Sequence, residues 1–163
     1  MSPAAGIRSY LASLLELRGF RVDTAEDGRS ALALLEQISD TDVSVLIQGE
    51  SGVGKEIIAR AVHSTSERSE KPFIKVNCAA LPAELLESEL FGYEKGAFTG
   101  ANARKQGRVA HAHGGTMFLD EIGEMSPALQ GKLLQVLQDG QFSRLGGETD
   151  LQVDTRILLV VDN

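Results

Sequence analysis

One short segment has the residue types and spacing of a phosphate-binding site. It follows the pattern G-x-x-x-x-G-K, with Gly49, Glu50, Ser51, Gly52, Val53, Gly54 and Lys55. Glycines allow successive backbone N–H groups to turn toward phosphate oxygens, and a helix that follows adds its positive N-terminal end. The closing lysine reaches the β- and γ-phosphates of a nucleotide. The segment therefore predicts a P-loop; the alternative is a glycine turn with a chance lysine.

The residue after this lysine departs from the usual P-loop pattern. Serine or threonine normally stands there and supplies a hydroxyl for Mg²⁺, whereas this chain has Glu56. A carboxylate can approach the metal directly or through water. Glu56 is therefore a candidate metal ligand.

Two adjacent acids, Asp120 and Glu121, follow an apolar segment farther along the chain. A carboxylate at the end of a buried strand can hold Mg²⁺, and a second one can polarise an attacking water as a general base. Taken alone, the pair fits a helix N-terminus or a solvated turn equally well. With a P-loop upstream, the arrangement favours phosphate chemistry.

The elements that must position these residues alternate between strand and helix. Strands are predicted at 20–25, 43–48, 73–77, 115–120 and 156–161, helices at 7–18, 29–38, 54–66, 82–90, 107–113 and 127–138, and a hairpin within 142–153. Such alternation is typical of parallel βαβ units. We therefore expect an α/β fold, with a three-layer, mainly parallel, five-stranded P-loop NTPase-like sheet.

Composition limits the classes of function. The 163 residues predict a single domain over 1–163, and the net charge of −7 argues against direct DNA binding. No apolar run is long enough to span a membrane. The single cysteine, Cys78, excludes an intrachain disulfide and is expected to be a small buried residue. We expect a cytoplasmic monomer.

Residues 43–157 resemble the AAA+ domain of bacterial sigma-54-dependent transcriptional activators. The resemblance extends over the P-loop with Glu56 and over several further blocks: Asn77–Leu81, Glu89–Gly92, Gly114–Glu121 and Phe142–Gly147. The most diagnostic block is the sequence GAFTGA, formed by Gly96, Ala97, Phe98, Thr99, Gly100 and Ala101. In the family this loop contacts the sigma factor, so the resemblance implies sigma-54 as a partner.

The resemblance also implies roles for individual residues. Lys55 would bind phosphate of ATP or ADP, and Asp120 would support Mg²⁺. Glu121 would prepare the attacking water, and Asn77 would hold Glu121 in a switchable position. Arg144 matches an arginine that acts at a subunit interface of the family's ring oligomers. Without the resemblance, Asn77 fits a strand-end cap and Arg144 a solvated hairpin residue.

The two ends of the sequence resemble a different family, the response-regulator receiver domain. Residues 157–163 are similar to its first strand, and residues 1–38 to the helix, strand and helix that follow. This indicates a chimera or designed recombinant, in which the AAA+ core lacks its lid and arginine fingers. An AAA+ arrangement predicts the strand order 20–25, 43–48, 156–161, 115–120, 73–77, whereas a receiver places 20–25 beside 156–161.

Three functions remain open at this stage. The first is ATP binding with weak or no hydrolysis in isolation. The second is a non-enzymatic scaffold that combines fragments of two folds. The third is a transcription regulator that contacts sigma-54 through the GAFTGA loop.

Overall fold

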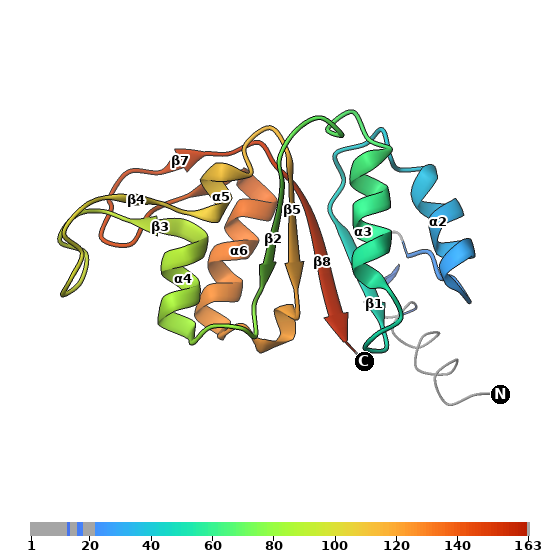
Figure 1. Cartoon of the computed structure of the whole chain (residues 1–163), viewed down its shortest axis with the longest axis horizontal. Coiled ribbons are helices and arrows are strands. Elements are labelled where there is room, and N and C mark those ends of the chain that lie inside the picture. Colours follow the sequence, from blue (N-terminus) through green and yellow to red (C-terminus); the bar gives the residue numbers. More distant parts are fainter. Residues whose placement is uncertain (1–12, 14–15, 18–21, 163) are drawn as a thin grey trace.

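The centre of the molecule is a sheet of four parallel strands. The computed structural model describes residues 13, 16–17 and 22–162, and within them the strands are β1 (Val45–Gly49), β2 (Phe73–Asn77), β5 (Thr116–Asp120) and β8 (Arg156–Asp162). Their order is β1-β8-β5-β2, as Figure 1 shows. The α/β class and the predicted order of these four strands are confirmed.

The predicted fifth strand at 20–25 is wrong for the residues that can be compared. Residues 22–25 form no strand, and residues 20–21 lie outside the described part of the chain. Asp23 and Thr24 are exposed, and Asp27 caps the next helix by accepting a hydrogen bond from the Ser30 amide at 2.8 Å. These polar residues make the segment a lead into that helix. The helix predicted at 7–18 lies mostly outside the described residues.

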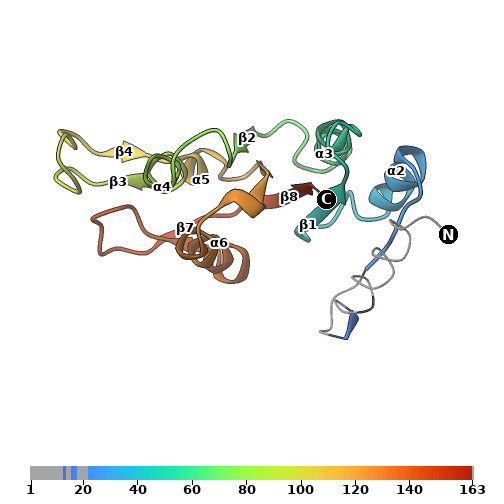
Figure 2. The same ribbon diagram turned by 90° about the horizontal axis from the view of Figure 1, so that it is seen from below.

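Helices cover both faces of the sheet, as the view in Figure 2 shows. One face carries α2 (Gly28–Glu36) and α3 (Lys55–Ser64). The other carries α4 (Ala83–Phe91), α5 (Arg108–His111), the 3₁₀ turn η1 (Ile122–Glu124) and α6 (Pro127–Asp139). The predicted three-layer arrangement is therefore confirmed. No helix in the described part of the chain is long and apolar enough to cross a membrane.

Two apolar clusters hold these layers together. Successive strand residues point to opposite faces, so Met117 and Leu119 of β5 join the cluster beneath α4 and α6. Phe118, between them, joins the α3 cluster together with Leu158 and Val160 of β8. β5 and β8 are thus covered on both faces, and this packing holds the two strands in position.

Two short hairpins extend from the sheet at the end of the molecule away from α2 (Figures 1 and 2). The first pairs β3 (Gly92–Tyr93) with β4 (Lys105–Gln106), and the second pairs β6 (Gln141–Phe142) with β7 (Leu151–Gln152). Gly92 has a φ of +74°, and a Cβ added there would lie 2.3 Å from the Lys105 carbonyl oxygen. Only glycine allows this close approach.

Candidate nucleotide-binding site

The carboxyl ends of the four strands meet at one edge of the sheet, the lower edge in Figure 1. Asn77 lies opposite Asp120 in the β2–β5 register, and Gly49 lies opposite Asp162 in the β1–β8 register. Ligands of open α/β sheets bind outside this edge. The fold therefore brings the glycine loop, Asn77 and the acidic pair to the edge where a ligand is expected.

The glycine loop connects β1 to α3 as the pattern predicts. Gly52 and Gly54 have φ angles of +81° and +90°, a region that side chains make unfavourable. Gly54 stands immediately before α3, so the chain enters the helix at Lys55. These two turns direct the loop backbone around the N-terminus of the helix, where an anion is stabilised.

Lys55 is held beneath the loop by three oxygens. Its side chain is only 8% exposed. Nζ donates to the carbonyl oxygens of Gly49 at 3.0 Å and Glu50 at 2.5 Å, and forms an ion pair of 2.7 Å with Oδ1 of Asp162. The hydrogen bond from Lys55, with a smaller contribution from Ser51, lowers the pKa of Asp162 below its ordinary value.

Glu56 is paired with two cations. Its carboxylate accepts hydrogen bonds from Lys75 Nζ at 2.5 Å and from Arg60 Nη2 at 3.0 Å. Hydrogen bonds from Lys75 and then Arg60 lower the pKa of Glu56. Both carboxylate oxygens are thus engaged between α3 and β2, and Glu56 is not grouped with the acidic pair.

The acidic pair lies where β5 ends. Asp120 is its last residue, and Glu121 begins the 3₁₀ turn with φ of +55° and ψ of +46°. Glu121 is the only non-glycine residue with a positive φ in the described part of the chain. This left-handed backbone costs free energy for a residue with a side chain.

Asn77 makes a local contact at the end of β2. Its Oδ1 accepts a hydrogen bond from the Ala79 amide at 2.9 Å. Among the hydrogen bonds of the described residues, none joins Asn77 to Glu121. The contact matches the strand-end cap that the sequence alone allows, while the register keeps Asn77 beside Asp120.

The 96–101 loop lies at the tip of the first hairpin. It is closed by a hydrogen bond of 2.8 Å from the Gly96 amide to the Ala101 carbonyl. Ala101 is buried, whereas the Phe98 side chain is 44% exposed and touches the Tyr93 ring edge-on at 4.8 Å between centroids. The loop therefore presents an aromatic ring to solvent, far along the molecule from α2 (Figure 1).

Arg144 lies between the two hairpins. Its Nη1 donates to Oε1 of Glu94 at 2.9 Å, and its side chain is 13% exposed. The Glu94 amide also donates to the Leu145 carbonyl at 3.0 Å. In this chain Arg144 thus joins its own hairpin to the base of the 96–101 loop, and is more buried than a solvated hairpin residue.

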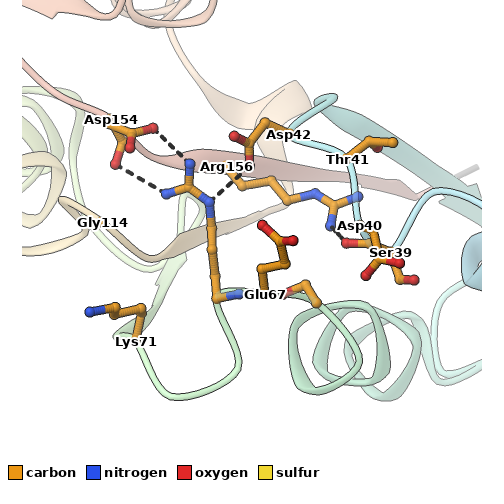
Figure 3. Close-up of a pocket in the computed structure, with 11 residues that line it drawn as sticks. Ser39, Asp40, Thr41, Asp42, Glu67, Lys71, Gly114, Asp154 and Arg156 are labelled. Atoms are coloured by element: carbon orange, nitrogen blue, oxygen red, sulfur yellow. Dashed lines mark hydrogen bonds and ion pairs between the residues drawn. The ribbon is translucent and has the colours of Figure 1, made fainter.

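A polar pocket of about 320 Å³ lies at the opposite edge of the sheet, where β8 begins (Figure 3). Arg156 is 1% exposed and donates to the carbonyl oxygens of Ile38, Ser39 and Val43 at 2.9, 3.0 and 3.2 Å. Beside it, Arg68 bridges Asp42 and Asp154. The guanidinium groups of Arg68 and Arg156 are thus occupied by the protein itself, and they attach the connector after α2 to the sheet.

Sequence reasoning missed two of these residues. Asp162, within the segment 157–163, has no predicted role of its own, although it follows an apolar strand as Asp120 does. The predicted strand order already places the strand of Asp162 beside the P-loop strand. That order alone indicates that Asp162 lies near Lys55. Glu94 carried no signal, because its partner Arg144 is 50 residues away.

Comparison with known families gives one match that covers most of the chain. The family model described as "Sigma-54 interaction domain" matches residues 22–163. The match is continuous and includes 22–38 and 157–163, the segments that resembled a receiver. Neither this match nor the similar proteins described next support a receiver segment or a chimera.

The chain is similar to several Nif-specific regulatory proteins. It is 54% identical over 159 residues to the Nif-specific regulatory protein of Rhodobacter capsulatus, a match that covers 93% of this chain and 28% of the relative. It is 59% identical over 127 residues to the protein of the same name from Azorhizobium caulinodans, covering 78% and 21%. The chain thus spans less than a third of the length of these relatives.

Solved structures agree with the fold. NtrX from Brucella abortus in complex with ATP superimposes with a TM-score of 0.75 at 34% identity, covering 98% of this chain and 35% of that one. The same protein in complex with ADP gives a TM-score of 0.76 at 35% identity, with the same coverage. The P-loop NTPase domain of a sigma-54 activator from E. coli gives a TM-score of 0.52 at 21% identity, covering 80% and 83%, and supports the fold alone.

Proposed function

Because the chain belongs to the sigma-54 interaction domain family, we propose that it binds ATP or ADP through the loop at residues 49–55. The observation that carries this proposal is the buried Lys55 amine beneath a loop with two left-handed glycines. The nucleotide-bound structures of NtrX, which the chain resembles over 98% of its length, support it.

Mg²⁺ fits the acids at the edge of the sheet. Carboxylate oxygens are its preferred ligands, and it usually takes only one or two of them together with phosphate oxygens and water. No group of three potential ligands is found among the described residues. We assign Asp120 to the metal and Glu121 to the attacking water. Glu56 suits the metal less well, since Lys75 and Arg60 occupy its oxygens.

Titration calorimetry with ATP and Mg²⁺ tests the nucleotide site. The wild type should release measurable heat, and Lys55→Ala should bind at least tenfold more weakly because a charge-assisted contact to phosphate is lost. Lys71→Ala, which removes an exposed lysine elsewhere, is the matched control. Equal binding by the wild type and Lys55→Ala would reject the proposal.

ATP hydrolysis should be slow, because such sites gain a factor of about 10³–10⁵ in rate from an arginine supplied by another subunit.

The exposed aromatic ring of the 96–101 loop supports a second activity, contact with sigma-54. A loop closed on itself that presents Phe98 to solvent suits protein recognition. Capture of purified sigma-54 by the immobilised chain, with and without nucleotide, measures it. Phe98→Ala should abolish capture while nucleotide binding stays unchanged. Equal capture of sigma-54 by the wild type and Phe98→Ala would exclude the loop as the contact site.

A further inference from the structure

We propose that Asp162 is a specificity-determining residue of the nucleotide site, whose carboxylate competes with phosphate for Lys55 and weakens ATP binding more than ADP binding. The inference rests on the proposed nucleotide binding and deepens it. It concerns a residue of β8, outside the glycine loop and outside the acidic pair that ends β5.

The position of Asp162 follows from the sheet order. β8 lies between β1 and β5, and Asp162 is the register partner of Gly49, the first residue of the glycine loop. The last residue of β8 therefore meets the loop at its base. The Asp162 side chain is 33% exposed, so it lies at the surface of the site.

The hydrogen bonds of Lys55 show what a nucleotide has to displace. An ammonium group has three N–H donors, and Lys55 Nζ has three oxygen partners: Gly49 O, Glu50 O and Asp162 Oδ1. No donor is left for a phosphate. Two of the partners are neutral carbonyls of the loop itself, and only Asp162 carries a charge. Phosphate binding therefore exchanges one anion for another at this amine.

The same carboxylate distinguishes nucleotides by their charge. When phosphates approach Lys55, Asp162 stays at the edge of the site, because its backbone is paired with Gly49 at the base of the loop. Like charges this close repel, and the repulsion grows with the charge brought in. ATP carries one more phosphate than ADP, at the end that the P-loop lysine contacts. Asp162 should therefore penalise ATP more strongly.

The test is calorimetric titration of ATP and of ADP, each with Mg²⁺, into the wild type and Asp162→Asn. The substitution keeps the shape of the side chain and removes its charge. We expect ATP to bind about tenfold more tightly to Asp162→Asn, the factor typical of one charge-assisted hydrogen bond, and ADP to gain less. Asp150→Asn is the matched control: it makes the same change of charge at an exposed position of the second hairpin, and it should bind as the wild type does.

The double variant Lys55→Ala/Asp162→Asn separates competition for the amine from a general effect on the fold. If Asp162 acts through Lys55, most of its effect on ATP disappears in the Lys55→Ala background. An equal gain in both backgrounds would overturn the proposal. Thermal unfolding of Asp162→Asn and of Asp162→Ala without nucleotide establishes that each variant is folded before it is titrated.

The remaining outcomes are distinguishable. If Lys55→Ala loses binding while Asp162→Asn binds ATP no better than the wild type, the role of Asp162 is rejected and the nucleotide site stands. Weaker ATP binding by Asp162→Asn also rejects it, because the carboxylate then assists the nucleotide. If the wild type and all variants bind equally poorly, the proposed function fails, and this inference fails with it.

Discussion

Arg144 Nη1 lies 2.9 Å from Glu94 Oε1, and this contact joins the β6–β7 hairpin to the base of the 96–101 loop. Gly146 adds to the same junction, since a Cβ placed on it would lie 2.8 Å from the Cβ of Ala97. The loop is therefore supported by a neighbouring hairpin rather than by its own strands, which are only two residues long.

Arg144→Ala should lower the free energy of unfolding by about 1–2 kcal/mol, between the values typical of exposed and buried ion pairs. Urea denaturation of Arg144→Ala, Glu94→Gln and the double variant completes a thermodynamic cycle. A coupling energy near zero would show that the contact contributes nothing to stability.

Arg156→Leu should reduce the free energy of unfolding by about 3 kcal/mol or more. The substitution removes the three hydrogen bonds that the buried Arg156 guanidinium donates to the carbonyl oxygens of Ile38, Ser39 and Val43. A hydrogen bond from a charged group contributes about 1.5–3 kcal/mol. Arg104→Leu, at an exposed position, is the control. Denaturation curves that coincide for the two variants would contradict this account.

Stability should fall as the pH decreases from 7 toward 5, and His63 should contribute to the decline. His63 Nδ1 lies 2.9 Å from Thr116 Oγ1, and burial lowers its pKa below the ordinary value. The folded state then binds the proton less tightly than the unfolded state, so stability is present above the unfolded pKa, about 6.5, and is lost as pH falls toward the folded pKa.

His63→Gln removes the titrating group, so its free energy of unfolding should change less over this range. Urea titrations at several pH values measure the slope. His111→Gln, at an exposed position, should keep the wild-type slope. If His63→Gln also keeps the wild-type slope, the pH dependence of stability comes from other groups.

Two glycines should respond to alanine in opposite directions. Gly131 lies inside α6 with no atom within 4 Å of an added Cβ, and alanine there should stabilise the fold by about 1 kcal/mol. At Gly115 the added Cβ would lie 2.1 Å from the Pro72 carbonyl oxygen. Alanine there should destabilise by about 1–3 kcal/mol or more. Melting temperatures decide both, and a shift of the same sign for the two variants would contradict the packing described.

The parts of this molecule that sequence alone predicts are those in which the signal is continuous along the chain. The glycine loop is such a case, because its strand, turn and helix are adjacent. Cys78 is another: it is buried as expected, and burial raises the pKa of its thiol to about 12. The segment at 22–25 misled because a short alternation of side chains does not distinguish a strand from an extended lead into a helix.

Contacts between distant segments were harder to predict. Glu56 was a reasonable metal ligand in sequence, but Lys75 of the neighbouring strand attracts its carboxylate. Arg144, which the family resemblance assigns to a subunit interface, makes a short contact with Glu94 of its own chain. In both cases the partner is a charge that only the packing of separate elements brings near.

The left-handed backbone of Glu121 has an evolutionary consequence. Glycine would adopt this conformation without the strain that a side chain imposes, so Glu121→Gly is a substitution that favours the folded state while deleting the carboxylate. Selection for thermal stability alone would therefore tend to remove the residue to which we assign the attacking water. Its retention in engineered variants has to be selected through activity.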